Sequence, residues 1–321
     1  MGRAASLRAP RTLVRERETG DSATLLPLMA QLRVIKNRMG AVKTIERITK
    51  TMQMIATAKF TAASQRAAAT KPYTERISDL VHEVSVNAPE YDSPLVKGPS
   101  DPVKREYMLV ISSDRGMCGA YNGNIFKLAL QHIRACKEAG IELEIEVSGK
   151  KAVNFFRFQR IDVRERYELG DKPEFEAVEQ IADKVISEFG EGRYDAARVI
   201  YMRFISNSQQ VPTVTQLLPM GRPEEEGSAS EAEGPAVVYD FTPSVDELLD
   251  ELLPRMIKTV LFQSFNDSSV SEQMMRMVAM KAATENAKDF GRTLKRKFNR
   301  ARQSQITTEL TEIISGAAAL E

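Results

Sequence analysis

The stretch IKNRMGAVKTIERITKTMQMI, from Ile35 to Ile55, decides the fold because its apolar residues recur every three or four positions. This spacing gathers them on one side of a helix, and Lys and Arg fill the other sides. Neither Gly nor Pro occurs between Ala41 and Lys71, so the local sequence does not stop the helix there. We therefore predict a long N-terminal helix whose apolar stripe consists of Ile35, Met39, Val42, Ile45, Ile48, Met52 and Ile55.

A second long helix is predicted from Ser244, which forms a capping box with Glu247 three residues later. Its expected apolar stripe comprises Val245, Leu249, Leu252, Met256 and Val260, then Met274, Met277 and Val278, and finally Ile306, Leu310, Ile313 and Ala317. Two such helices at opposite ends of a chain predict an antiparallel coiled coil. The alternative is a helical bundle folded back on the middle of the chain, but the heavy charge of both helices argues against it.

The middle of the chain alternates between strand-like and helix-like segments. Strands are expected at 107–113, 141–147, 198–205 and 211–218, and helices at 124–139, 151–158 and 175–189. This alternation predicts an α/β domain. The predicted fold class is thus α/β, with a long antiparallel coiled coil of the N- and C-terminal helices and a central Rossmann-like domain. The expected boundaries are 30–87 for the first helix, 88–243 for the α/β domain with an acidic loop at 223–235, and 244–321 for the second helix.

Residues 1–29 form a separate N-terminal segment in this interpretation. The first 28 contain five Arg but lack the apolar run of a secretory signal. Arg, Ala and Ser are typical of a mitochondrial transit peptide, whereas Glu16, Glu18 and Asp21 argue against one. We interpret the segment as a disordered tail, or as the product of an upstream start codon with the working start at Met29.

Charge is distributed unevenly along a chain whose net charge is only +1. From Ala30 to Arg76 the net charge is +8, and from Arg276 to Arg302 it is +7. Two basic ends predict that both helices meet something acidic. The longest apolar runs fall far short of the roughly 20 residues that span a bilayer, so we expect membrane association only through partners.

The feature most like an enzyme site is the turn from Ser113 to Ala120, between a predicted strand and a predicted helix. It has neither the G-x-G-x-x-G spacing nor a Walker Lys-Ser/Thr pair, and Asp114 would repel a phosphate. Cys118 and Cys136 are 18 residues apart, and His82 and His132 have no neighbours at metal-ligand spacing. We predict no catalytic residue, no cofactor and no metal. An enzyme using the Gly116–Gly119 turn and a nucleic-acid-binding coiled-coil protein remain the alternatives.

Three parts of the chain resemble the γ subunit of bacterial and mitochondrial ATP synthases. They are the N-terminal helix from Ile35 to Phe60, the segment SSDRGMCGAYNGNIFK from Ser112 to Lys127, and the C-terminal segments Arg276 to Phe290 and Ala301 to Leu320. The resemblance covers about residues 30–321 in the family order. It implies a non-catalytic rotor shaft, with its terminal helices inside a ring of α and β subunits that holds the catalytic sites.

The resemblance also implies roles for individual residues. Contacts with the β subunit are implied for Met52, Arg276, Gln303 and Thr307. An apolar bearing tip is implied for Ile313, Ile314, Ala317 and Leu320. A subunit-contact turn is implied for Asp114, Arg115, Gly116 and Gly119.

The partners implied by the resemblance are the α and β subunits, the ε subunit and the membrane-embedded c-ring, with no nucleic acid and no direct insertion into the membrane. The expected location is the cytoplasmic side of the bacterial cell membrane, as a peripheral protein. The alternative location is the matrix side of the mitochondrial inner membrane.

Because the phosphate-binding motifs are missing, the purified chain should neither bind nor hydrolyse ATP. Isothermal titration calorimetry of the chain with ATP should give only the heat of dilution. Micromolar binding of ATP would contradict this prediction.

Overall fold

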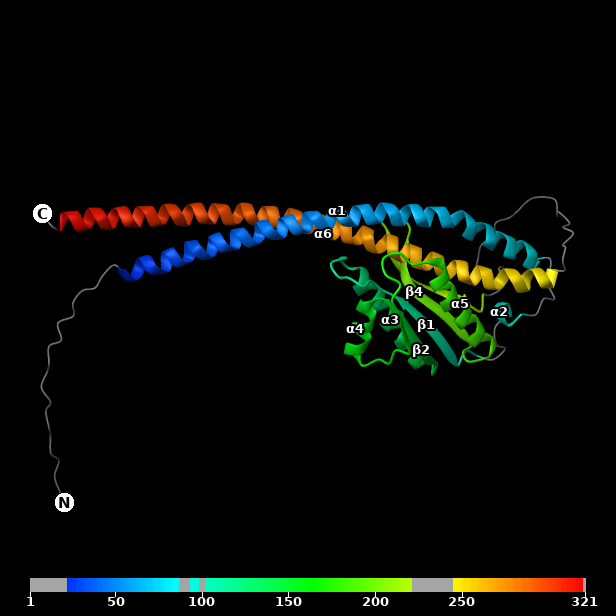
Figure 1. The fold of residues 1–321 in the computed structure, drawn as a ribbon. Coiled ribbons are helices and arrows are strands. Elements are labelled where there is room, and N and C mark those ends of the chain that lie inside the picture. Colours follow the sequence, from blue (N-terminus) through cyan, green and yellow to red (C-terminus); the bar gives the residue numbers. More distant parts are fainter. Residues whose placement is uncertain (1–21, 87–92, 98–101, 221–244, 320–321) are drawn as a thin grey trace, which may run out of the picture. The chain divides into compact units, whose positions relative to one another are not determined.

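The computed structural model describes residues 22–86, 93–97, 102–220 and 245–319 (Figure 1). The acidic loop at 223–235, the first 21 residues, Ser244 of the expected capping box and Leu320 lie outside these ranges. The chain divides into two compact units, one formed by 1–47 with 284–321 and the other by 48–283. The helix–domain–helix division expected from the sequence differs from these units, because the inner half of each long helix belongs with the α/β domain.

Both long helices are present. Helix α1 runs over Ser22–Val86 and helix α6 over Val245–Ala318. Helix α1 begins eight residues before the expected boundary at 30, where Ala and Leu residues favour helix, and it continues past Pro72. Beyond Pro72, Ile77 and Val81 pack in one cluster with Leu249 and Leu253 of α6, and this packing stabilises the last turns of α1. Among the described residues, no helix combines the length and apolar character needed to cross a membrane.

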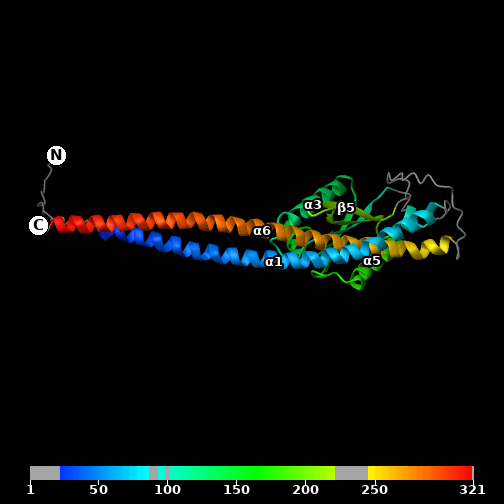
Figure 2. The same cartoon turned by 90° about the horizontal axis from the view of Figure 1, so that it is seen from above.

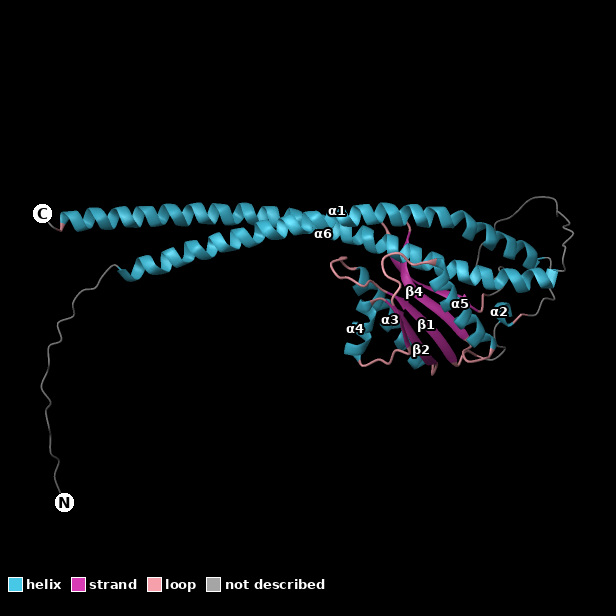
Figure 3. Cartoon of the chain, in the orientation of Figure 1, coloured by secondary structure: helices cyan, strands magenta, loops and turns pink. Residues whose placement is uncertain are grey.

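The second unit contains a five-stranded sheet in the order β3-β2-β1-β4-β5 (Figure 3). Its strands are β1 Arg105–Ile111, β2 Glu142–Ser148, β3 Glu165–Tyr167, β4 Ala196–Phe204 and β5 Gln210–Leu218. All neighbouring strands are parallel except β4 and β5, which form an antiparallel hairpin. The four expected strands are confirmed within a few residues. The short strand β3 and the short helix α2, Pro94–Lys97, were not predicted.

Helices cover both faces of the sheet, as parallel strands require. Helices α3, Tyr121–Glu138, and α4, Lys150–Gln159, pack on the face that carries Met108 and Val110. Helix α5, Phe175–Gly190, and the part of α6 from Ile257 to Phe265 pack on the face that carries Tyr107 and Leu109. Figure 2 shows α3 and α5 on opposite sides of α6.

The stripe on α1 differs from the sequence prediction. Most of its buried residues fall in one series of seven-residue steps, at Val42, Thr49, Ala56, Ala63, Ile77 and Val84, although Thr70 of this series is only half-buried. Val81 is buried as well. Ile45, Ile48 and Ile55, which were expected on the stripe, are each about half exposed. Small and polar residues at the buried positions permit close approach of a neighbouring helix, a property that apolar spacing alone does not reveal.

The stripe on α6 is also shifted from the prediction. Its inner part buries Leu249, Leu253, Ile257, Leu261 and Phe265, spaced by four residues, rather than the expected Leu252, Met256 and Val260. In the other unit, Val42, Ala287 and Leu294 form a cluster with Ile35 and Met39, so the outer halves of the helices pack together there. The predicted fold class, two long terminal helices packed together plus a central α/β domain, is confirmed.

Gly149 precedes α4 and crosses closely over the end of β1. Its φ is +95°, and a Cβ added there would lie 2.3 Å from the carbonyl oxygen of Ser112. Gly149→Ala should therefore lower the free energy of unfolding by more than about 2 kcal/mol, because the cost of the strained backbone conformation is added to the cost of the clash with Ser112. Chemical denaturation of the purified chain measures this change.

Gly140→Ala is the matched control, because Gly140 also has a positive φ, +72°, but nothing lies within 4 Å of an added Cβ. It should cost about 1 kcal/mol, the strain of the left-handed conformation alone. Equal losses in the two variants would show that the contact with Ser112 does not matter.

Candidate functional site

The turn between β1 and α3 is held together by its own side chains. Ser113 Oγ donates to the carbonyl oxygen of Arg115 at 2.7 Å. Asn122 Nδ2 donates to Ser113 Oγ at 2.7 Å and to Cys118 Sγ at 3.2 Å. Cys118 is only 2% exposed. It therefore fills the interior of the turn and is not presented as a nucleophile.

Two residues of the expected subunit-contact turn serve the fold. Asp114 Oδ1 accepts a hydrogen bond of 3.0 Å from the backbone N–H of Lys150, the first residue of α4, where a carboxylate is favourable. Gly119 has a φ of +60°, and an added Cβ would lie 3.7 Å from Ala279 Cβ on α6. Arg115 and Met117 are the long exposed side chains of the turn, and the sequence analysis missed Met117.

Arg276 lies inside the chain rather than on its surface. Arg276 is only 7% exposed. Its Nη2 atom forms an ion pair with Glu272 Oε1 at 2.6 Å and donates a hydrogen bond to the carbonyl oxygen of Arg115 at 3.1 Å. Burial raises the pKa of Glu272 despite the nearby charge of Arg276. The contact of Arg276 with a β-subunit loop stays a prediction, and within this chain its hydrogen bonds join α6 to the turn after β1. Glu272, four residues earlier on the helix, was the available signal.

Helix α6 passes the carboxyl ends of the strands, the edge where nucleotides bind in many Rossmann-like domains. The strand order reverses between β1 and β4, and ligands of such sheets bind at this point. Beside it, Phe265, Ser268 and Glu272 of α6 line a cavity together with Ser112 and Ser148, at the ends of β1 and β2. This cavity is about 30 Å³, room for water but not for a nucleotide.

A second link joins α1 to the α/β domain. Lys59 forms an ion pair with Asp171, and the backbone carbonyl of Asp171 accepts a 3.1 Å hydrogen bond from Ser269 Oγ on α6. Burial alone would raise the pKa of Asp171, but the hydrogen bond and charge of Lys59 outweigh burial and lower it. In addition, Thr70 Oγ1 of α1 lies 3.0 Å from Gln263 Oε1 of α6.

The long helices expose the basic residues that the sequence analysis singled out. On α1 these are Arg33, Lys36, Arg38, Lys43, Arg47 and Lys50, and on α6 Lys281, Lys288, Arg292, Lys295, Arg296, Lys297, Arg300 and Arg302. Met52, half-buried on α1, follows Lys50 by two residues. The exposed sides of both helices are therefore strongly cationic.

The end of α6 exposes both polar and apolar side chains. Gln303 and Thr307 are exposed on one face, where Thr307 Oγ1 donates to the carbonyl oxygen of Gln303 at 3.0 Å. Ile313 is 69% exposed and Ile314 60%, and Ala317 is exposed as well. Leu320 lies outside the described residues.

The expected seam residues Ile306 and Leu310 are also more than half exposed, which corrects their assignment to the seam. Between Gln305 and Glu312, the less exposed positions of α6 are Gln305, Thr308, Glu309 and Glu312. A polar seam of this kind cannot be recognised from the spacing of apolar residues.

Comparison with known proteins identifies the family. A family model described as ATP synthase matches residues 31–320. The ATP synthase gamma chain of Rhodopirellula baltica is 39% identical over 296 residues, covering 91% of this chain and 100% of the relative. The ATP synthase gamma chain of Pelotomaculum thermopropionicum is 36% identical over 294 residues, with the same coverage.

Solved structures share the fold. A chain of the Euglena gracilis mitochondrial ATP synthase (OSCP/F1/c-ring, rotational state 3) aligns with a TM-score of 0.59 at 18% identity, covering 91% of this chain and 95% of that one. A chain of the Tetrahymena thermophila mitochondrial ATP synthase central stalk and c-ring aligns at 0.52 and 19%, covering 74% and 99%. Matches over nine tenths of the sequence and over both long helices lead to one conclusion: this chain belongs to the ATP synthase gamma chain family.

Proposed function

We propose that the chain is the central rotor shaft of a proton-transporting ATP synthase. It couples proton flow through a membrane ring to conformational change and ATP synthesis at the β subunits, and it is itself non-catalytic. Its partners are the α and β subunits, the ε subunit and the c-ring. It sits peripherally on the cytoplasmic side of a bacterial membrane, with the matrix side of the mitochondrial inner membrane as the alternative.

The observation that carries this proposal is the surface of the two long helices in a chain of this family. Cationic residues cover α1 and α6, and the end of α6 exposes Ile306, Leu310, Ile313 and Ile314. Exposed apolar side chains that follow one another along a helix mark a surface that a partner covers. A ring of subunits with acidic loops and an apolar collar fits both surfaces.

The mechanism follows from asymmetry and charge. A single shaft inside a ring of three β subunits presents a different face to each, and each face stabilises a different β conformation. Rotation then shifts the conformational populations of the β subunits in sequence. Acidic β-subunit loops ride on the exposed Lys and Arg, since solvated ion pairs form and break at small cost.

The end of α6 acts as the bearing in this mechanism. Ile313, Ile314, Ala317 and Leu320 turn within an apolar collar, and Gln303 and Thr307 offer neutral hydrogen bonds that form and break in each turn. A large charged group at the tip would lose its hydration in the collar and resist rotation.

The non-catalytic role is supported by the packing of α6 at the carboxyl ends of β1 and β2. The cavity that α6 side chains line there is about 30 Å³, too small for a nucleotide. The turn from Asp114 to Gly119 then acts as a subunit-contact surface through Arg115 and Met117. Arg276 supports this surface from within, by holding the carbonyl oxygens of the turn.

Met52→Lys tests the contact between α1 and the acidic loops. The added cation should form an ion pair in some rotational positions only, worth about 1 kcal/mol, which biases those positions about fivefold. Proton pumping driven by ATP should therefore fall more than ATP hydrolysis, measured on vesicles carrying the complex. Met52→Leu, the neutral control, should leave the ratio of the two activities unchanged. If Met52→Lys reduces both activities equally, the contact is not where we place it.

Gln303→Leu tests the second contact, because it removes a neutral hydrogen-bonding group from an exposed position. We expect slower steady-state hydrolysis and weaker assembly of the complex, with the unfolding free energy of the isolated chain changed by less than about 0.5 kcal/mol. Wild-type turnover and assembly would mean that Gln303 is merely solvated.

Arg276→Ala should behave differently, because it leaves Glu272 buried without its cation and costs about 3 kcal/mol of stability. This loss of stability should be smaller at low pH. Burial raises the pKa of Glu272 in the folded chain, so protonation of Glu272 removes the unpaired buried charge and favours folding.

A further inference from the structure

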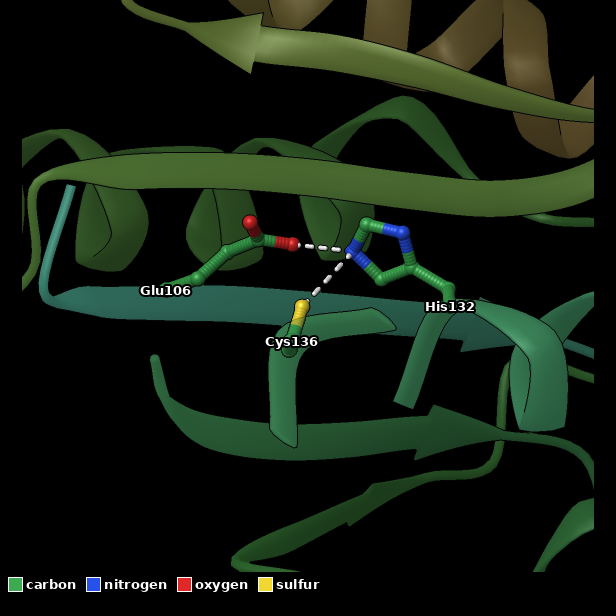
Figure 4. Close-up of side chains that lie close together, drawn as sticks. All are labelled: Glu106, His132 and Cys136. Carbon is green, nitrogen blue, oxygen red and sulfur yellow. Dashed lines mark hydrogen bonds and ion pairs between the residues drawn. The ribbon is translucent and has the colours of Figure 1, made fainter. Parts of the chain in front are cut away.

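Three side chains with metal-binding atoms meet at the edge of the α/β core. They are Glu106 on β1 and His132 and Cys136 on α3, and Figure 4 shows dashed lines from one ring nitrogen of His132 to both Glu106 and Cys136. One carboxylate oxygen, Nε2 of His132 and Sγ of Cys136 all lie within 4.8 Å of one another. The sequence analysis predicted no metal here: it did not use the spacing of four residues between His132 and Cys136, and Glu106 precedes His132 by 26 residues on another element.

The local fold explains why these atoms converge. His132 and Cys136 are four residues apart, so they project from one face of α3, the same relation that joins paired ligands in helical zinc motifs. Glu106 shares its face of β1 with Met108 and Val110, which pack against α3. The packing of α3 on β1 therefore places the carboxylate of Glu106 next to His132 and Cys136.

The spacing fits a tetrahedral cation. Zinc binds imidazole nitrogen at about 2.0 Å and thiolate sulfur at about 2.3 Å, which places the two ligand atoms about 3.5 Å apart in a tetrahedral site. Cys136 Sγ lies 3.5 Å from His132 Nε2. Glu106 Oε1 and His132 Nε2 are in direct hydrogen-bond contact, so they must part slightly to admit the ion.

We propose that Glu106, His132 and Cys136 bind a divalent cation of the zinc type, with solvent as the fourth ligand. Thiolate and imidazole together select zinc over magnesium or calcium, which prefer oxygen ligands. The thiolate and the carboxylate balance the charge of the ion. The site clamps α3 to β1 and is independent of the rotor function proposed above.

The surroundings support the ligand set. The side chain of Glu106 is fully buried, and its other oxygen, Oε2, pairs with Arg198, which fixes the orientation of the carboxylate. Arg198 in turn donates to Gln216 Oε1 at 3.3 Å. The His132 side chain is 15% exposed, which gives the ion and its solvent ligand access.

The thiol is the ligand that a cation would change most. Burial raises the pKa of Cys136 and the charge of Glu106 raises it as well, whereas Arg198 lowers it. A coordinated thiol loses its proton to become the thiolate that zinc binds.

The test uses the full-length chain, reduced and stripped of metal, titrated with Zn²⁺ against a chromophoric chelator. The wild-type chain should bind one zinc, and Cys136→Ser should bind it at least about tenfold more weakly. Cys118→Ser is the matched control, because it removes the other buried cysteine, which lies outside the cluster, and it should bind like the wild type. Co²⁺ should give a thiolate charge-transfer absorption in the wild type and Cys118→Ser but not in Cys136→Ser.

Circular dichroism without metal checks that Cys136→Ser is folded, and His132→Gln provides a second variant that should lose the same affinity. Equal zinc affinity in the wild type and Cys136→Ser would overturn the proposal. So would a wild-type chain without the cobalt–thiolate band, which would reduce the cluster to a hydrogen-bonded His132–Glu106 pair.

Discussion

A parallel sheet has to be covered on both faces, and in this chain the C-terminal helix provides part of one cover. Leu249, Leu253, Ile257, Leu261 and Phe265 recur every four residues, and the last three pack on the sheet face formed by β1 and β4. Burying each such side chain contributes about 1.5–3 kcal/mol. The α/β domain is therefore incomplete without the inner half of α6, although α6 begins 140 residues after the start of β1, at Val245 against Arg105.

This arrangement also decides what the domain can do. Having crossed the sheet face, α6 continues past the carboxyl ends of the strands, where Glu272 and Arg276 are buried against the turn after β1. A buried ion pair at this point is costly unless its remaining hydrogen bonds are made, and the carbonyl oxygens of Arg115 and Gly116 make them. Contacts within the chain, between α6 and the turn after β1, therefore occupy this edge of the sheet. The outer surfaces of the helices are available to partners.

Much of the fold follows from the sequence, but the helix seams do not. Apolar runs and alternation placed four strands and three helices, because burial on a sheet demands those patterns. On α1, by contrast, Thr49, Ala56 and Ala63 occupy the buried positions, while Ile45 and Ile48 are half exposed. Hydrophobicity indicates what a partner covers as well as what the chain itself buries, and the sequence alone does not separate the two. The resemblance implied that Arg276 contacts a partner. Its burial, however, depends on Gly116, which lies 160 residues earlier in the chain and cannot be paired with it from the sequence.

The proposed rotor needs a rigid connection between its long helices and its α/β domain. Within the unit formed by 48–283, α1 is tied to the α/β domain through Lys59 and Asp171, and α6 through Ser269, Ser271 and Arg276. Each tie includes a charged or buried hydrogen-bonded group, so sliding one element past another would leave polar groups unpaired. A rotor transmits torque only if its helices cannot turn independently of the domain that drives them. Ties of this kind would give the proposed shaft that property, while the exposed Lys and Arg of both helices face the surface, where ion pairs exchange at small cost.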